Sequence, residues 1–594
     1  MAFTPVQPHT ADYRIARLQS LLTSVVPVSL DYRTVFWFVV SLAFSAYFAS
    51  LALHQAFASP FVVQDDARQH VFWMERFLDP QLFPNDLIAD YFQSVAPTGY
   101  SAFYNLMTHL GIDPMLLNKL LPMALGLITT AYCFLLCLRI LPSPGAAFFS
   151  TLILNQSLWM QDDLVSATPR AFLYPLFLAF LYYLVNDSRV ACLVVIALQG
   201  LFYPSTVFIT AGVLVLQLVS FEGRRLRLSR ARRDYLFCAA GLAVVSCVLL
   251  FYAIKLRSVG PVITATEARA LPEFWSGGRT SFFGYDFWRF WVTRKRSGLL
   301  PDPLLEDLPL YLALLLPLVI YYRRWFPLAQ KITESIRVLP RIIITSLFMF
   351  AAAHVMLFRL HHPNRYTQHS LRIVFAIAAG TGIAIIFDAL FDWARRPSMR
   401  AIARKSFAVT LAVIFIVLLV RFPRYVASFP DAKYRVGNAP ALYEFFSQQP
   451  KDTLVASLAQ EVRSIPTFSK RSILVAREYA LAYHTRYYAQ MQVRASDLIV
   501  AHYSADLSVL QSFIRKYAIT FFMVNRKAFN AHYIERDSWI QQYQPAAANA
   551  LNQLERGIAP AISRLMTTCA VFEDEEYVVL SSERILNASL PDNQ

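Results

Sequence analysis

Long apolar stretches recur through the first 423 residues and constrain the fold more than any other feature of the sequence. The first runs from about Val35 to Phe57. Ten more begin near Met115, Gly145, Arg170, Val190, Thr206, Tyr235, Leu308, Ile342, Leu371 and Ser406. A chain with 56% hydrophobic and 16% charged residues would expose large apolar patches in water, which soluble proteins do not tolerate. The sequence therefore predicts a polytopic α-helical membrane protein with about eleven transmembrane helices, several of them shorter than the roughly 20 residues of a straight crossing.

Clusters of basic residues between the apolar stretches predict the orientation in the membrane. The segments 222–234, 323–341 and 393–405 carry six, five and five Lys or Arg residues, a pattern typical of cytoplasmic loops. We therefore expect residues 1–34 in the cytoplasm and a transmembrane domain over 35–423, with an acidic first outer loop at 59–113. If the chain is bacterial, this membrane is the inner or plasma membrane. The net charge of +16 lies largely in such loops, so nucleic acid is not an expected partner.

The last segment, 424–594, is soluble in composition and mixes helical and strand patterns. Its apolar runs predict short buried strands at 454–458, 472–476, 519–524 and 577–580, and helices at 498–517 and 548–566. We expect an extracytoplasmic α/β domain of ordinary size. It contains no Gly-rich phosphate loop, so no nucleotide site is predicted there.

Two pairs of adjacent carboxylates follow apolar stretches on the predicted outer side. Asp65-Asp66 comes just after the first stretch, and Asp162-Asp163 comes just after the third. Adjacent carboxylates repel one another unless a cation or a basic group offsets them, so both pairs favour a functional site. Their oxygen atoms suit Mg²⁺ or Mn²⁺, and one carboxylate could instead be a general base.

Structural roles remain open for the same residues. Asp65 or Asp66 could cap the helix predicted at 67–78, and Asp163 could be an ordinary loop residue. The pattern of the predicted helix is typical of one that lies along the membrane interface with a polar face opposite its apolar face. Arg68, Gln69 and Glu75 belong to that polar face. Asp66 projects toward the apolar side, which is a costly place for a charge without a partner.

The connection 359–372 is rich in cations on a side of the membrane where cations are unusual. It contains Arg359, Arg365 and Arg372 together with His361, His362 and His369. Because Arg binds phosphate through paired hydrogen bonds, we predict a phosphate site formed by the three arginines and His361. The alternatives are arginines that extend toward lipid head groups and a metal site at the two adjacent histidines, whose spacing is a weak signal.

The segment 256–306 combines aromatic residues with one candidate carboxylate. Trp275, Trp288 and Trp291 are typical of an interfacial aromatic belt, although such rings also suit stacking against a sugar or a polyprenyl chain. Glu267 is a candidate carboxylate on the acceptor side. The sequence does not separate these interpretations.

In this arrangement the chain resembles the GT-C class of integral-membrane glycosyltransferases over about residues 35–423. The resemblance rests on the many apolar stretches, Asp65-Asp66 after the first, the acidic site in the next outer connection, and the C-terminal α/β domain. The layout is similar to that of protein O-mannosyltransferases, aminoarabinose transferases and the catalytic subunit of oligosaccharyltransferase, but the WWDxG motif of the last is absent. The segments 365–372 and 441–446 are most similar to uncharacterised bacterial members.

The resemblance implies a cell-envelope enzyme of glycan biosynthesis that transfers a hexose or pentose from a polyprenyl-phosphate donor with inversion. One carboxylate of the first loop, Asp65 or Asp66, would act on the acceptor hydroxyl. Arginines on outer loops would stabilise the departing phosphate. In some members Mg²⁺ or Mn²⁺ takes part, and its ligands here would be Asp66 and Asp163. The acceptor, whether lipid, glycan or protein, is not implied.

Two other classes of function fit a polytopic chain with charged outer loops. A transporter or flippase of lipid-linked saccharides should place ionisable residues near the middle of its spans, whereas the charges here lie near predicted span ends. A non-catalytic assembly protein would not need its acidic residues and arginines to converge on one site.

Overall fold

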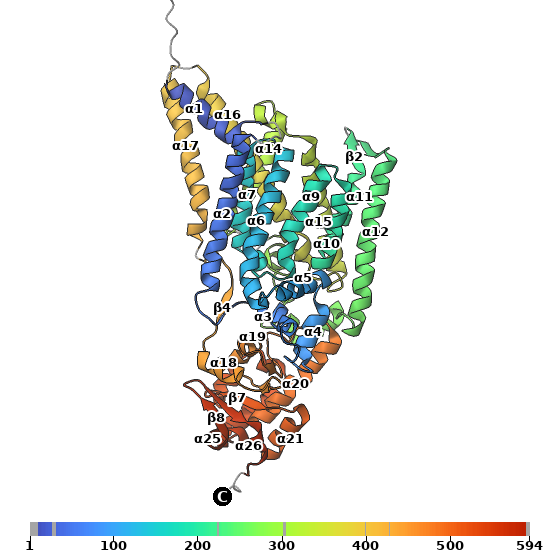
Figure 1. Ribbon diagram of the computed structural model, residues 1–594, viewed down its shortest axis with the longest axis vertical. Coiled ribbons are helices and arrows are strands. Elements are labelled where there is room, and N and C mark those ends of the chain that lie inside the picture. The colour runs from blue at the N-terminus through green and yellow to red at the C-terminus, as the bar shows by residue number, and fades with distance from the viewer. Residues whose placement is uncertain are drawn as a thin grey trace, which may run out of the picture.

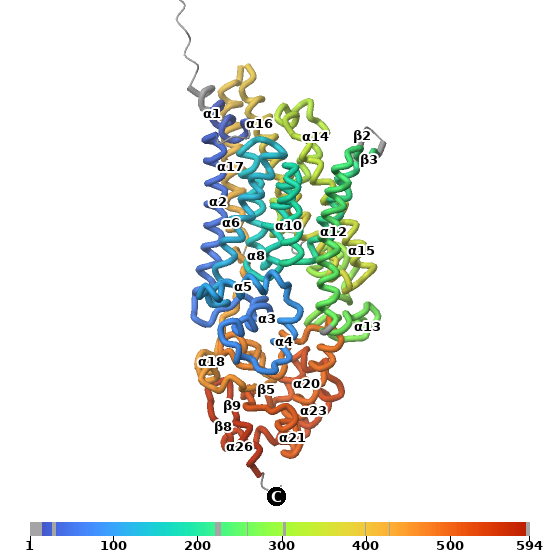
Figure 2. Tube along the Cα trace, turned by 45° about the vertical axis from the view of Figure 1, so that its right-hand side comes forward, coloured from blue at the N-terminus to red at the C-terminus, as the bar shows by residue number. Residues whose placement is uncertain are grey.

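The computed structural model describes residues 10–26, 31–222, 225–300, 305–397, 399–426 and 428–589. A bundle of helices makes up the larger part of the molecule, and a smaller region that carries a sheet adjoins one end of it (Figures 1 and 2). Every predicted apolar stretch forms a helix of the bundle. These helices are α2 (Tyr32–Ala56), α6 (Pro114–Ile140), α7 (Pro144–Trp159), α9 (Leu173–Val185), α10 (Arg189–Phe202), α11 (Thr206–Gln217), α12 (Arg232–Lys255), α14 (Leu315–Tyr321), α15 (Val338–Val355), α16 (Gln368–Arg395) and α17 (Ala401–Arg421).

Within the described residues, six helical segments are long and apolar enough to cross a membrane. They are Tyr32–Ala56, Pro114–Ile140, Arg232–Lys255, Glu334–Val355, Pro363–Arg395 and Ala401–Tyr425. Four other apolar segments span 10–17 residues, and α7 has 16 residues, all short of the roughly 20 needed for a straight crossing. Length and composition therefore support six of the roughly eleven expected crossings. The other helices are shorter, since turns such as Asn186–Ser188 between α9 and α10 interrupt the apolar sequence.

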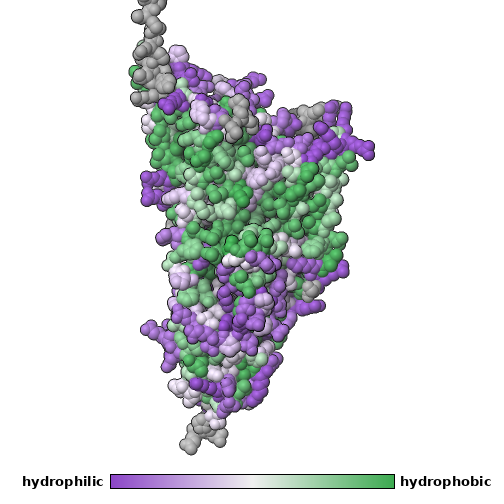
Figure 3. All heavy atoms as spheres, viewed as in Figure 1, coloured by the Kyte–Doolittle hydropathy of each residue, from purple (hydrophilic) through white to green (hydrophobic). Residues whose placement is uncertain are grey.

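Apolar side chains cover the outward faces of the bundle. Val35, Phe36 and Val39 of α2 are exposed, as are Leu250 and Phe251 of α12. Figure 3 shows hydrophobic atoms over the bundle on one face, whereas hydrophilic atoms gather at its upper end and over the region below. A surface of this kind is not stable in water but is suited to lipid. The chain is therefore an integral membrane protein.

The centre of the bundle is formed by α16, which packs against α7 and against the segment before α14. Most side chains of α16 are buried. Gly380 lies so close to α7 that a Cβ atom there would be 2.2 Å from the backbone nitrogen of Ser150. The absence of a side chain at this position therefore allows the two helices to approach closely.

The C-terminal region contains a five-stranded mixed sheet with the order β6-β5-β7-β9-β8. Its strands are β5 (Leu454–Ala456), β6 (Ser472–Ile473), β7 (Phe521–Asn525), β8 (Ala570–Glu573) and β9 (Tyr577–Ser581). β5 is parallel to β6 and β7, whereas β9 is antiparallel to β7 and β8. The structure thus has all four predicted strands and adds β8. The predicted boundary of the domain stays a prediction.

Two long helices predicted in this region are each divided. The predicted helix at 498–517 is the end of α20 (Thr485–Tyr503) followed by α21 (Leu507–Tyr517), because the side chain of Asp506 caps the backbone nitrogen of Ser508 at 2.8 Å and starts a new helix. The predicted helix at 548–566 is α23 (Ala546–Glu555) followed by the short α24 (Ala561–Arg564), and Gly557 between them adopts φ +71°. A glycine in this conformation is a common helix terminator.

The first loop lies between the bundle and the C-terminal region in both views (Figures 1 and 2). It contains β1 (Val62–Gln64), α3 (Ala67–His70), the 3-10 helix η1 (Phe72–Phe77), α4 (Leu87–Val95) and α5 (Thr98–His109). The prediction of an interfacial helix over 67–78 is wrong. Arg68, Gln69 and Glu75, which were assigned to the polar face of that helix, are all buried. The C-terminal region covers this face and supplies partners such as Lys470, which lies 2.6 Å from Glu75.

Candidate active site

A short strand pairing positions the first acidic pair. β1 is antiparallel to β4 (Tyr434–Val436), with Gln64 opposite Tyr434, and the backbone nitrogen of Asp65 donates to the carbonyl of Lys433 at 3.1 Å. The Gln64 side chain accepts from the backbone nitrogens of Asp66 and Ala67 at 2.8 and 3.3 Å. Gln64 thus satisfies the start of α3, and Asp66 makes no side-chain capping hydrogen bond. The capping alternative does not explain the Asp66 carboxylate.

The second acidic pair begins the short helix α8 (Asp162–Val165), directly after α7. The chain then turns sharply at Ala167, whose φ is +47°. Tyr100 and Tyr104 each donate a hydrogen bond to the Ala167 carbonyl at 3.2 Å. This turn brings Arg170, at the start of the next helical segment, back toward Asp163.

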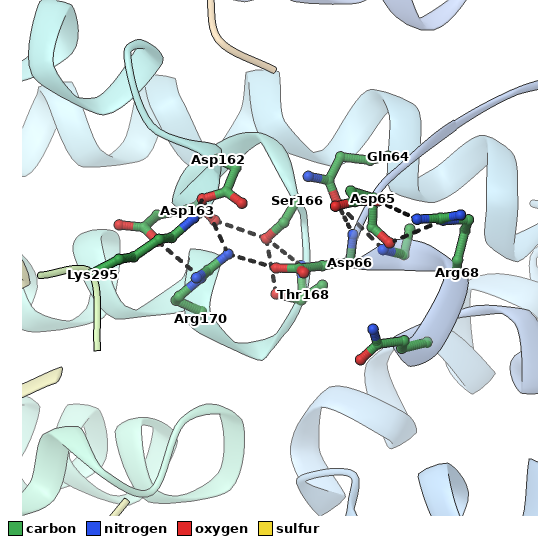
Figure 4. A network of polar contacts seen from close by, with 12 residues as sticks. Gln64, Asp65, Asp66, Arg68, Asp162, Asp163, Ser166, Thr168, Arg170 and Lys295 are labelled. Atoms are coloured by element: carbon green, nitrogen blue, oxygen red, sulfur yellow. Dashed lines mark hydrogen bonds and ion pairs between the residues drawn. The ribbon is translucent and has the colours of Figure 1, made fainter. Parts of the chain in front are cut away.

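Arg170 joins the two acidic pairs (Figure 4). Its Nη2 lies 2.6 Å from Asp66 Oδ2 and 3.6 Å from Asp162 Oδ1, while its Nε lies 3.0 Å from Asp163 Oδ1. The side chains of Arg170, Asp162 and Asp163 are about one-tenth exposed, and that of Asp66 is 30% exposed. The convergence of carboxylates from the two loops, expected from the predicted topology, is thus present around one guanidinium.

The far side of Asp163 contacts residues of α9 and α16. Its Oδ2 accepts from Tyr174 at 2.9 Å and lies 3.1 Å from Arg372 and 3.2 Å from His369. His369 and Arg372 are three residues apart on α16, which places them on one helix face. Burial would raise the pKa of Asp163, but Arg170, His369 and Arg372 hold it well below its usual range. Arg372, predicted to contact phosphate, therefore serves as a partner of Asp163.

Asp65 points away from this cluster. Its carboxylate is paired with Arg68, and Arg435 lies 3.1 Å away. Burial acts to raise the pKa of Asp65, yet these two arginines lower it overall. Asp65 is thus held by two cations, whereas Asp66 has Arg170 as its ion-pair partner among the described residues.

A second group of cations has fewer acidic partners. Among the residues that the structure describes, the Arg365 side chain has no hydrogen-bond or ion-pair partner, and its Nε is buried. Burial lowers the pKa of the nearby His362 far below its usual value, and Arg296 and Arg365 act in the same direction. His362 is almost fully buried, and its Nε2 has no partner in the described structure. Arg296 and Arg365, with the neutral His362 beside them, are called the basic cluster below. Its two guanidinium groups make it a candidate site for an anion.

His70 of the first loop is influenced electrostatically by both the acidic residues and the arginines. Burial lowers the pKa of His70 to about 4; Asp66 opposes this shift, and Arg170, Arg365 and Arg279 reinforce it. The imidazole is therefore neutral at pH 7 and senses one carboxylate and three guanidinium groups. Asp66 and Arg365 thus both act on the same imidazole.

Several residues that the sequence analysis did not select contribute to the candidate site, among them Arg170, Arg279, Lys295 and Glu478. Arg279 lies 2.7 Å from Glu478 of the C-terminal region, Lys295 lies 3.5 Å from Asp162, and Arg170 joins the acidic pairs. The signal for Arg170 was its place at the outer end of an apolar stretch, seven positions after Asp163. No comparable signal marked Glu478, because its partners Arg68 and Arg279 are remote in sequence.

Other predicted site residues form no hydrogen bond or ion pair with the acidic cluster in the described parts of the chain. Arg359 and His361 are exposed, and Arg359 forms no ion pair with any described residue. Glu267 is also exposed and forms a capping box with Thr264 at the start of α13 (Ala265–Ala270), which gives it a structural explanation. The roles predicted for these residues in binding phosphate or acceptor stay predictions.

The arrangement does not fit a divalent cation between Asp66 and Asp163. Within the described parts of the chain, no group of three or more His, Cys, Asp or Glu residues is arranged to hold a metal ion. To bind both carboxylates, such an ion would have to occupy the position of the Arg170 guanidinium. The predicted metal-ligand role of Asp66 and Asp163 is therefore not supported by their contacts.

No protein family and no curated protein sequence matches this chain. It is similar in fold to solved structures of the oligosaccharyltransferase of Archaeoglobus fulgidus. The structure with a tethered acceptor peptide containing the NVT sequon has 11% sequence identity and a TM-score of 0.48, and 86% of this chain covers 72% of that one. For the same enzyme, AglB, in complex with an inhibitory peptide and a dolichol-phosphate, the sequence identity is 11% and the TM-score is 0.49. Here 87% of this chain covers 72% of that one.

A third structure of that enzyme, a complex with Zn and sulfate, has 11% identity and a TM-score of 0.40, with 85% of this chain covering 70% of that one. These structure neighbours belong to the GT-C class, which the sequence also resembles. Because identity and TM-scores are low, the function has to be inferred from the residues of this chain.

Proposed function

We propose that this protein is a GT-C-type glycosyltransferase that moves a sugar from a polyprenyl-phosphate donor to an acceptor on the outer face of the membrane. The observation that carries the proposal is the convergence of two acidic loops on one site. Arg365, which has no hydrogen-bond or ion-pair partner among the described residues, and Asp66 both act on His70. A general base and an anion site next to each other are what an inverting sugar transfer requires.

In the proposed reaction Asp66 accepts the proton of the acceptor hydroxyl. The hydroxyl oxygen forms a bond to the anomeric carbon as the bond from that carbon to the phosphate oxygen breaks, which inverts the configuration. The polyprenyl phosphate leaves with the electron pair of the broken bond. Asp66 suits the role of base better than Asp65, because Asp65 is held by two arginines whereas Asp66 pairs with one, Arg170, among the described residues.

The basic cluster is proposed to bind the donor phosphate. Arg365 is available because it has no acidic partner among the described residues, and Arg296 and Arg279 lie near it. The departing phosphate gains negative charge as the bond breaks, so cations that are already in place stabilise the transition state more than the ground state.

The proposed outer position of the site agrees with the charge distribution along the bundle. The basic segment around Arg232 and Arg233 begins α12 beside the hairpin of β2 (Val219–Glu222) and β3 (Arg225–Leu228). Figure 1 places this hairpin at the end of the bundle opposite the C-terminal region. Since basic clusters favour the cytoplasm, the end that carries Asp66 and Asp163 would face outward.

The decisive experiment supplies the purified protein in nanodiscs with a panel of labelled polyprenyl-phosphate sugars and detects released polyprenyl phosphate. Wild type should consume at least one donor in the presence of an acceptor extract, and Asp66→Asn should not. Asp90→Asn is the matched control, because Asp90 lies in the same loop but pairs with Arg76 at 2.8 Å, away from the site. If wild type neither binds nor consumes any donor of the panel, the proposal fails.

A further inference from the structure

Arg170 stands where an enzyme of the proposed kind could use a divalent cation. Resting on the proposed function, we infer that the Arg170 guanidinium takes the place of that cation between the acidic loops. The sugar transfer then proceeds without a bound metal, and Arg170 is a positioning residue for Asp66.

The first argument is how the carboxylate oxygens are occupied. Asp163 uses Oδ1 for Arg170 and Oδ2 for Arg372, Tyr174 and His369. Asp162 Oδ1 lies within 3.6 Å of both Arg170 and Lys295. A divalent ion binds carboxylate oxygens directly at about 2.0–2.6 Å, and Asp163 has no oxygen left for that bond unless an existing partner is displaced.

The second argument is charge. Three carboxylates, Asp66, Asp162 and Asp163, form ion pairs with the permanent cations Arg170, Arg372 and Lys295. A further divalent ion would meet a cluster whose negative charge is already balanced, and it would lie against Arg170 in a site of low solvent exposure. Repulsion between like charges is strong in such an environment.

The third argument is the geometry of the guanidinium. Nε and Nη2 point to carboxylates of different loops (Figure 4), as the planar fork of arginine allows and a lysine would not. The turn that carries Arg170 is fixed by the hydrogen bonds of Tyr100 and Tyr104 to Ala167. Arg170 is thus a built-in cation that orients Asp66 while leaving part of that carboxylate exposed.

The test measures metal binding in the absence of substrate. Chelator-treated protein in nanodiscs is titrated with Mn²⁺, and the bound ion is followed by electron paramagnetic resonance. Wild type should show no saturable site that depends on Asp66. Removing the cation with Arg170→Gln should free the carboxylates and tighten Mn²⁺ binding by at least about tenfold, an effect that Asp66→Asn should reverse. Arg189→Gln is the matched control, since Arg189 pairs with Asp187 and Asp234 in another part of the bundle.

Two results would overturn the inference. One is a tight wild-type Mn²⁺ site that Asp66→Asn and Asp163→Asn both abolish, and the other is a folded Arg170→Gln variant that gains no Mn²⁺ binding. If Arg170→Gln does not fold, two measurements on wild type decide. One is the Mn²⁺ titration, and the other is the rate of donor turnover, which should be the same before and after EDTA treatment within about twofold. Because the titration needs no donor, its outcome is separate from failure of the proposed function.

Discussion

At the scale of single residues, the two carboxylates of the first loop should differ sharply in their effect on turnover. Asp66→Asn removes the proposed base and should lower kcat by about 10²- to 10⁴-fold. Asp65→Asn should have a much smaller effect, because Asp65 is bound to Arg68 and Arg435. Steady-state kinetics with one active donor measure both. Equal losses in the two variants would contradict the assignment of the base.

Arg365 and Arg359 provide a second comparison within one connection. Arg365→Ala should weaken donor binding by about 10- to 100-fold, the range for losing one hydrogen bond to a charged group. Arg359→Ala should bind the donor nearly like wild type, because Arg359 is exposed to water whereas the Nε of Arg365 is buried. Equilibrium competition with a polyprenyl phosphate gives the affinities, and an equal loss in both variants would place the phosphate elsewhere.

Residues of the site differ in how far the sequence could predict them. Asp65-Asp66 and Asp163 were found because adjacent carboxylates on a predicted outer surface are unusual. Helical spacing alone did not reveal that Arg372 would pair with Asp163, and its predicted phosphate role stays a prediction. The sequence could not predict Glu478, because its contacts depend on the packing of a distant region against the first loop.

At the scale of elements, the close approach of α16 to α7 can be tested by substituting Gly380. A side chain at Gly380 would overlap the backbone of α7, so Gly380→Val should destabilise the bundle by about 1–3 kcal/mol. The unfolding temperature in detergent should fall accordingly. Gly126→Ala is the control, because a Cβ atom in that α6 glycine would meet its nearest neighbour at an ordinary 3.4 Å. An unchanged melting temperature for Gly380→Val would show that the helices are not packed this closely.

The apolar pattern predicted the positions of the helices better than their lengths or surroundings. Each predicted stretch is helical, because a long apolar run in a membrane has to satisfy its own backbone hydrogen bonds. Which helices would be long enough to cross depended on turns such as that between α9 and α10, which interrupt the apolar pattern only briefly. The prediction for segment 67–78 was wrong because an amphipathic pattern does not show whether a helix packs against lipid or against another part of the protein.

At the scale of the whole molecule, the proposed orientation places the C-terminal region outside the cell. Glu444, on α18 (Pro440–Ser447), and Met399 are both exposed. In a background without the exposed Cys247, an impermeant maleimide should label Glu444→Cys in intact cells and Met399→Cys after permeabilisation alone. The reverse pattern would put the site on the cytoplasmic side and contradict the charge-based orientation.

The C-terminal region reaches the site through Glu478, which accepts from Gln69 and lies 2.7 Å from Arg279 and 3.7 Å from Arg68. This buried carboxylate connects three segments that the sequence places far apart. The C-terminal region therefore completes the site by fixing two arginines and the first loop.

Replacing Glu478 tests whether this connection matters for function. Glu478→Gln leaves Arg68 without its second carboxylate and Arg279 without a negative partner in contact, and such a loss in a buried pair costs about 3–5 kcal/mol. We expect faster hydrogen exchange in residues 67–77 and a fall in turnover of at least about tenfold. Glu444→Gln, in the same region but exposed, should change neither measurement. If Glu478→Gln kept both the exchange rate of the first loop and the turnover of wild type, the C-terminal region would be a separate module rather than a part of the site.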